Sequence, residues 1–148
     1  MRRGRVSPIR QCFVDTSAYF ALADSDDDNH QVARAVLHAL SSHHIKQVTT
    51  NYVIAETHAL MVNRLNRSIA LKFLQQLRAG NTTILRVPPA DEARAWQIIE
   101  AYTDKAFSFT DATSFAVMER LRIRHAFTFD DDFGQYGFTT LTPELLAS

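Results

Sequence analysis

The chain has 148 residues, of which 46% are hydrophobic and 10% aromatic, so it is expected to form a single domain with one buried core. Sixteen basic and sixteen acidic residues cancel to a formal charge of zero, which excludes a protein that attracts nucleic acid through its overall charge. Any nucleic-acid site must therefore be a local patch.

The single cysteine and the hydropathy pattern indicate a protein of the cytoplasm. Cys12 lies inside the apolar run QCFV, where a buried thiol is expected rather than a disulfide or a metal ligand. The basic N-terminus MRRGRVSPIR is followed by no apolar h-region, and no stretch approaches the roughly 18 apolar residues of a spanning helix. We therefore expect a soluble, cytoplasmic protein that does not enter a membrane.

Extended apolar segments alternate with segments of helical periodicity, a pattern typical of βαβ units around a parallel sheet. In the first half of the chain, the pattern predicts a strand at Gln11 to Val14, helices at Thr16 to Ala23 and His30 to His43, a strand at Gln47 to Thr50, and helices at Asn51 to Asn63 and Ser68 to Ala79. In the second half, it predicts a strand at Thr82 to Val87, helices at Ala90 to Tyr102 and Thr110 to Leu121, and strands at Ala126 to Phe129 and Thr139 to Leu141. An α/β fold is the resulting prediction.

Two acids follow strands directly. Asp15 comes after CFV and Asp130 comes after FTF, where three aspartates stand in a row. The carboxyl ends of parallel strands meet at one edge of the sheet, which is the usual ligand crevice of α/β folds. Alone, each acid is equally well explained as a helix N-cap or a turn residue. Together, they indicate a site at this edge.

Glu56 is expected to lie on an apolar helix face. In TNYVIAETHALM its neighbours on the helix surface include Tyr52, Val53 and Leu60, so its side chain is predicted to project from a stripe that faces the core. An ionised carboxylate in such a place requires a cation or hydrogen-bond donors. Glu56 is therefore either part of a functional site or the partner of a nearby arginine or lysine.

Asp111 opens the predicted helix SFTDATSFAVMERL, where the helix dipole alone would favour an acid. Phe115 and Met118 follow it at helical spacing, so Asp111 is expected at the inward-facing tip of an apolar face. Because this helix leads into the strand at Ala126 to Phe129, it should run antiparallel to the strands. Its first turn is then expected at the same edge as Asp15 and Asp130.

Carboxylates that converge without a histidine or cysteine cluster are typical ligands of a hard divalent cation such as Mg²⁺ or Mn²⁺, whereas zinc prefers other ligands. Such an ion can lower the pKa of a bound water and stabilise the charge that develops on a phosphodiester. The sequence therefore predicts a divalent-metal site built from acids.

Four blocks of the sequence, FVDTSAYFALAD, TTNYVIAETHAL, SFTDATSFAVM and FTFDDDFGQYGF, resemble in order and spacing the signature blocks of PIN domains. The chain is most similar to the VapC-type toxin ribonucleases of this family, from about Cys12 to Leu141. The resemblance implies a Rossmann-like α/β/α sandwich with a parallel sheet of four to five strands. It also implies a divalent-metal-dependent endoribonuclease that hydrolyses RNA through a metal-activated water, a role as the toxin of a toxin–antitoxin pair, a cognate antitoxin as partner, and a homodimer.

The resemblance also assigns roles to individual residues. Four residues take the family's acidic positions and are expected to be catalytic and to ligate one or two Mg²⁺ or Mn²⁺ ions: Asp15, Glu56, Asp111 and Asp130. Thr16 and Ser17 match the small hydroxyl residues that support the first aspartate by hydrogen bonds. Asp132 is a candidate outer ligand, and Asp131 is expected to be a solvated acid.

Other residues have less specific interpretations. Residues 1–10 form a basic segment that is expected to be a disordered tail, with a phosphate-contacting arm as the alternative. Asp104 precedes the third block at a position that is often acidic in relatives, and no role is assigned to it. Trp96 shares its predicted helix with two isoleucines and is expected in the core or at a dimer surface rather than as a platform that stacks RNA bases.

Two other functions fit parts of the pattern. A phosphotransferase of the haloacid dehalogenase type also places an aspartate after its first strand, but it usually carries a second acid two residues later, where this chain has Ser17. A catalytically silent PIN-like module that binds RNA or a partner would not require acids at all four positions. The metal-dependent ribonuclease is therefore the leading hypothesis.

Overall fold

The computed structural model describes residues 8–147, so the greater part of the basic N-terminal segment, and with it the predicted tail or arm, lies outside the described residues. A five-stranded sheet occupies the centre, in the order β3-β2-β1-β4-β5, and each neighbouring pair is parallel. Its strands are β1 (Gln11–Val14), β2 (Lys46–Thr50), β3 (Thr83–Leu85), β4 (His125–Phe127) and β5 (Thr139–Thr140). The parallel α/β sheet predicted from the sequence is confirmed.

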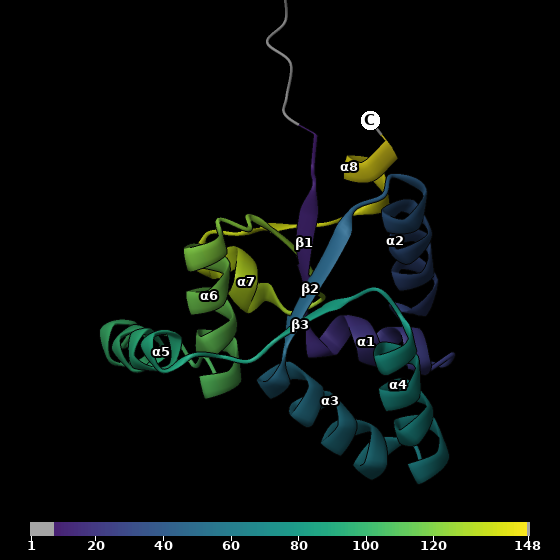
Figure 1. Cartoon of the computed structure of the whole chain (residues 1–148), viewed down its shortest axis with the longest axis horizontal. Helices are drawn as coiled ribbons and strands as arrows, with labels where there is room; N and C mark the ends of the chain where they lie inside the picture. Colours follow the sequence, from purple (N-terminus) through teal and green to yellow (C-terminus); the bar gives the residue numbers. More distant parts are fainter. Residues whose placement is uncertain (1–7, 148) are drawn as a thin grey trace, which may run out of the picture.

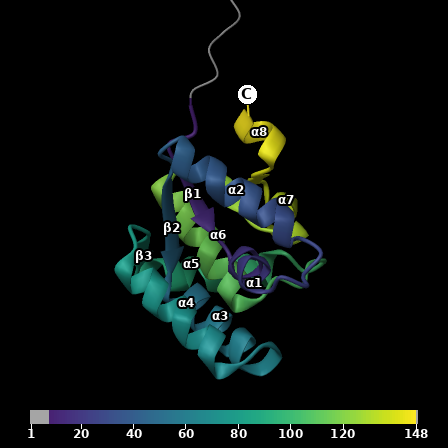
Figure 2. The same cartoon turned by 90° about the vertical axis from the view of Figure 1, so that its right-hand side faces the viewer.

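Helices cover both faces of the sheet and form the outer layers of an α/β/α sandwich. They are α1 (Thr16–Ala23), α2 (His30–Ser42), α3 (Asn51–Arg64), α4 (Arg67–Ala79), α5 (Pro89–Ala101), α6 (Phe109–Leu121), α7 (Asp131–Tyr136) and α8 (Pro143–Ala147). Helices α5, α6 and α7 lie on one side of the strands, and α1, α2 and α4 lie on the other (Figure 1). Figure 2 views the molecule from the side of α2 and α4.

This layering follows from the order of the strands. The chain moves from β1 through β2 to the edge strand β3, then returns to β4 and β5 on the other side of β1. Right-handed crossovers place the helices of the outward and return paths on opposite faces of the sheet. Helix α3 lies at the carboxyl edge, where it contacts α1, α4 and α6. The carboxyl edge is therefore surrounded by the first turns of several helices.

The core is densest around the central strand and α6. Cys12, Phe13 and Val14 of β1 are completely buried, as expected for a strand covered on both faces. Helix α6 buries every residue from 111 to 118, because it packs between the sheet and α5. The predicted buried thiol is confirmed, and burial raises the pKa of Cys12 to about 12.

The predicted strands and longer helices agree with the structure to within a few residues, whereas α7 and α8 were not predicted. Helix α7 has six residues, contains Gly134 and buries only Phe133, so it is too short to show helical periodicity. The strand predicted to reach Phe129 ends at Phe127 instead. Among the described residues, no helix is long and apolar enough to cross a membrane.

A partly buried ion pair joins the two helices of the return path. Asp91 in the first turn of α5 is almost completely buried, and both of its carboxylate oxygens accept hydrogen bonds from Nε of Arg120 in α6, at 3.1 and 2.9 Å. The pair therefore helps to hold α6, whose first turn carries Asp111, against α5.

We expect Arg120→Ala to lower the free energy of unfolding by about 1 to 3 kcal/mol, because the buried carboxylate of Asp91 loses its charged partner. Urea denaturation measures the change. Arg78→Ala, at an exposed arginine of α4, serves as the matched control and should stay within about 0.5 kcal/mol of the wild type. Equal effects of the two substitutions would show that the ion pair contributes no stability.

Candidate functional site

The carboxylate of Asp15 is held between the ends of the two central strands. Its Oδ2 accepts a hydrogen bond from the Ser17 hydroxyl at 2.9 Å and another from the Thr128 hydroxyl at 3.0 Å. The backbone N–H of Asp15 donates to the carbonyl of Phe127 at 3.1 Å, which continues the pairing of β1 with β4. Asp15 also caps α1. Its position is therefore fixed from both strands.

The same two hydroxyl groups bind the loop that carries Asp130. The Ser17 hydroxyl accepts from the backbone N–H of Phe129 at 2.9 Å, and the Thr128 hydroxyl accepts from the backbone N–H of Asp130 at 3.0 Å. The hydrogen bond from Ser17 to Asp15 agrees with the support that the sequence implied. Thr128 was missed, because a threonine inside a predicted strand carries no signal until the strand is known to end before it.

The Thr16 hydroxyl was expected to support Asp15, but it bonds to α3 instead. The Thr16 hydroxyl accepts a hydrogen bond from the Thr57 hydroxyl of α3 at 3.1 Å, and both residues are buried. Its side chain thus ties the first turn of α1 to α3, next to Asp15.

Asp111 forms a reciprocal cap with Ser108 at the start of α6. The Ser108 backbone N–H donates to Asp111 Oδ2 at 3.2 Å, and the Asp111 backbone N–H donates to the Ser108 hydroxyl at 3.0 Å. Burial, and then the negative charge of Asp15, raise the pKa of Asp111 to about 7, although the bond from Ser108 acts in the opposite direction. In the metal-free chain, Asp111 therefore holds its proton more tightly than an ordinary aspartic acid does.

Three carboxylates gather at this edge and are called the acid cluster below: one oxygen from each of Asp111, Asp130 and Asp132 lies within 4.8 Å of the others. Asp130 caps α7, and its Oδ1 accepts from the Asp132 backbone N–H at 2.9 Å. Burial raises the pKa of Asp130, and the neighbouring acids Asp132 and Asp131 add to the rise. Asp15 is close enough for its charge to act on Asp111.

The remaining aspartates that the sequence singled out differ in their distance from the site. Asp132, a candidate outer ligand, is a member of the acid cluster, whereas Asp131 is exposed, as expected of a solvated acid. Asp104 lies outside the acid cluster and is exposed, 3.8 Å from Lys105 Nζ.

The prediction that Glu56 is buried was wrong. Helix α3 buries Val53, Thr57 and Met61, and this line runs beside Glu56, whose side chain is exposed. The apolar neighbours of Glu56 misled the sequence interpretation, because Tyr52 and Leu60 are only half-buried at the margin of the contact. Glu56 is also not a member of the acid cluster among the described residues.

Glu56 nevertheless lies between two residues of α3 that contact the helices of the site. On α3, the ring of Tyr52 contacts Phe109 of α6, with centroids 5.9 Å apart, while Thr57 bonds to Thr16 of α1. Successive residues of a helix are rotated by about 100°, so Glu56 projects between the directions of Tyr52 and Thr57. Its direction from α3 therefore lies between those of the residues that contact α6 and α1.

The donor set suits a hard divalent cation. The acid cluster and Asp15 offer carboxylate oxygens, which Mg²⁺ and Mn²⁺ prefer. Burial is the main cause of the raised pKa of Asp111, and the negative charges of Asp15 and Asp130 add to it. A bound cation would relieve the repulsion between these charges. The arrangement therefore fits a metal ion of this class.

Residues 12–139 match the PIN domain family. The chain belongs to this family. The 23S rRNA-specific endonuclease VapC20 of Mycobacterium tuberculosis is 34% identical to this PIN domain over 133 residues, which are 89% of this chain and 98% of VapC20. Ribonuclease VapC26 of the same organism is 28% identical over 79% of this chain and 84% of its own length. The crystal structure of VapC20, described as a sarcin-ricin loop cleaving toxin, matches with a TM-score of 0.82 and 31% identity, over 89% of this chain and 99% of that one.

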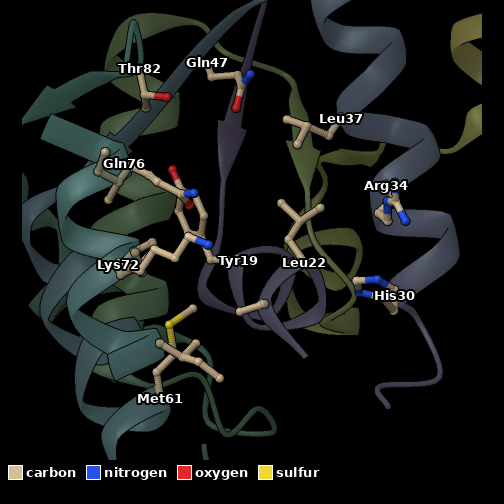
Figure 3. A pocket seen from close by; sticks show the side chains of 14 residues that line it. Tyr19, Leu22, His30, Arg34, Leu37, Gln47, Met61, Lys72, Gln76 and Thr82 are labelled. Carbon is tan, nitrogen blue, oxygen red and sulfur yellow. The ribbon is translucent and has the colours of Figure 1, made fainter. Parts of the chain in front are cut away.

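The PIN domain also has a cavity of about 650 Å³ away from the acids, between α1, α2 and α4. Figure 3 shows Leu37 and Arg34 of α2 on one side of this cavity and Lys72 of α4 on the other. Its lining is mainly apolar, and no member of the acid cluster belongs to it. The cavity is therefore a second surface feature, separate from the acidic edge.

The metal-free protein should lose stability as the pH rises from about 4 to about 7, because Asp111 holds its proton more tightly in the folded chain than in the unfolded one. Asp111→Asn removes this contribution. In EDTA, we expect the variant to be more stable than the wild type by about 1 to 3 kcal/mol near pH 8, with no such gain near pH 4. Urea denaturation across this pH range measures the difference. A difference that is independent of pH would contradict the raised pKa.

Proposed function

We propose that this PIN domain is a divalent-metal-dependent endoribonuclease. The observation that carries the proposal is the gathering of Asp15, Asp111, Asp130 and Asp132 at one edge, with the pKa of Asp111 raised to about 7. It is supported by the names of the relatives, since VapC20 is an endonuclease specific for 23S rRNA and VapC26 is a ribonuclease.

Asp111, Asp130 and Asp132 would hold Mg²⁺ or Mn²⁺, with Asp15 beside them and Glu56 approaching from the rim. When bound, such an ion lowers the pKa of a water molecule and stabilises the charge that develops on the phosphodiester. The chain itself supplies the geometry. Ser17 and Thr128 fix the orientation of the Asp15 carboxylate, and Ser108 fixes that of Asp111.

The reaction is a hydrolysis and needs no side-chain nucleophile. A water oxygen forms a bond to phosphorus in line with the ribose oxygen that leaves, and the bond from phosphorus to that oxygen breaks. The water gives up a proton to the solvent, and the leaving oxygen takes one up to become a hydroxyl group. The carboxylates hold the reacting groups and stay unmodified, so the substitution of any one of them should reduce cleavage without altering the products.

We further propose that the protein is the toxin of a toxin–antitoxin pair, acts in the cytoplasm, and is inhibited by a cognate antitoxin. The toxin description of VapC20 supports this role. The mainly apolar cavity between α1, α2 and α4, with Arg34 and Lys72 in its lining, suits a partner segment that carries apolar and acidic side chains. A homodimer belongs to the same proposal.

Asp15→Asn should reduce metal-dependent cleavage of RNA by roughly 100-fold or more, because it removes a charge that Ser17 and Thr128 hold at the site. Cleavage of a total RNA preparation with Mn²⁺ or Mg²⁺, and with EDTA as a blank, measures the effect. Asp104→Asn is the matched control, since Asp104 is exposed and outside the acid cluster. Near-full activity of Asp15→Asn would refute the assignment.

Glu56→Gln should leave the stability of the metal-free protein within about 0.5 kcal/mol of the wild type, because the side chain is exposed. Calorimetric titration with Mn²⁺ should show weaker binding, and cleavage should fall, because a charge is lost from the rim of the site. Unchanged Mn²⁺ affinity together with unchanged cleavage would remove Glu56 from the proposed ligands.

A further inference from the structure

Three aromatic side chains from three helices meet beside the acidic edge. The ring of Phe109, the first residue of α6, lies 5.9 Å from that of Tyr52 in α3 and 5.5 Å from that of Trp96 in α5, measured between centroids. We call Tyr52, Trp96 and Phe109 the aromatic patch. It joins α3, α5 and α6 at one surface.

Trp96 is the most exposed member. Its relative exposure of 61% is the highest among the exposed large hydrophobic residues of the described chain. Of the two places expected for Trp96, the core or a dimer surface, the structure therefore excludes the core. Its ring is inclined by 56° to that of Phe109, and the ring of Phe109 is inclined by 73° to that of Tyr52. Phe109 contacts the indole at one place, and the exposure of Trp96 leaves most of its ring open to a further aromatic group.

The aromatic patch lies on helices that also carry residues of the candidate site. Phe109 stands two residues before Asp111 in the first turn of α6, and Tyr52 stands one turn before Glu56 on the same side of α3. An extended strand of RNA whose phosphate lies at the acid cluster would therefore have a neighbouring nucleotide within reach of the patch.

The charge beside the aromatic patch favours a base over a phosphate. The carboxylate of Glu92 in α5 is close enough to the Tyr52 hydroxyl to act on it electrostatically, which places a negative charge at the patch. A carboxylate repels phosphate oxygens, but it accepts hydrogen bonds from the amino groups of bases. Unpaired bases commonly stack on aromatic side chains, whereas paired bases have no free face to offer.

We propose that the aromatic patch binds an unpaired base next to the scissile phosphate, with the indole of Trp96 stacked on that base. This inference rests on the proposed ribonuclease function and adds a requirement to it: the RNA must be single-stranded or splayed open at the nucleotide beside the cut. The patch then contributes to the choice of substrate, while the acids carry out the reaction.

The chain has a single tryptophan, so fluorescence excited at a wavelength that tyrosine does not absorb reports on Trp96 alone. Asp15→Asn protein in EDTA is titrated with a short single-stranded RNA of mixed sequence, so that nothing is cleaved. We expect saturable quenching, because a base stacked on the indole quenches its emission, and much weaker quenching by a duplex of the same sequence. Fluorescence that does not change while anisotropy of a labelled RNA shows binding would overturn the proposal.

The steady-state kinetics of RNA cleavage, with Mg²⁺ or Mn²⁺ present, provide the second measurement. Trp96→Ala should raise KM for the single-stranded substrate about tenfold with a smaller change in kcat, and Trp96→Phe should recover part of the loss, because a smaller ring still stacks. Val62→Ala, at an exposed apolar residue of α3, is the matched control and should leave both parameters unchanged. Equal KM values for wild type and Trp96→Ala would overturn the proposal.

A contact between two copies of the chain is the competing use of this surface. If Trp96 lies in such a contact, Trp96→Ala will change the mass measured by light scattering, RNA will leave the fluorescence unaltered, and the proposal fails. If the wild type cleaves RNA but RNA does not quench the fluorescence of Trp96, the base-binding role of the aromatic patch is refuted and the ribonuclease activity is not. Quenching by single-stranded RNA without any cleavage supports the patch and refutes the proposed activity.

Discussion

The burial of the Asp15 carboxylate between the ends of β1 and β4 is the constraint on which the site depends. A buried carboxylate is costly unless donors reach it, and here the donors are the hydroxyl groups of Ser17 and Thr128. Because each hydroxyl also accepts from the backbone of the β4 loop, the bonds that satisfy Asp15 hold Asp130 in place. Loss of either hydroxyl would loosen two acids together.

The beginnings of three helices also reduce the cost of bringing the acids together. Asp15 caps α1, Asp130 caps α7 and Asp111 lies in the first turn of α6. The partial positive charge at a helix N-terminus favours a nearby carboxylate, so each of these acids has local stabilisation that offsets part of the repulsion from its neighbours. A structural role as a cap and a role at the site are therefore compatible in the same residue.

The sequence was sufficient to place Asp15, Asp111 and Asp130 at one edge, because strand order and the direction of the helix before β4 determine where they lie. The sequence interpretation failed where the burial of a side chain depended on which face of its helix is covered by other helices. Glu56 has apolar neighbours, yet α3 buries the adjacent line of side chains, and Trp96 shares its helix with buried residues while facing outward. Thr128 and Asp132 became recognisable only once the end of β4 and the short α7 were known.

The two edges of the sheet limit how other chains can bind. The edge strands β3 and β5 have three and two residues, so each exposes too few backbone groups to pair with an added strand. Partners that bind by β-augmentation need a longer free edge. We therefore expect a protein that recognises this fold to dock through the side chains of its helices and loops, so that its specificity can change by substitution at the surface without any change in the sheet.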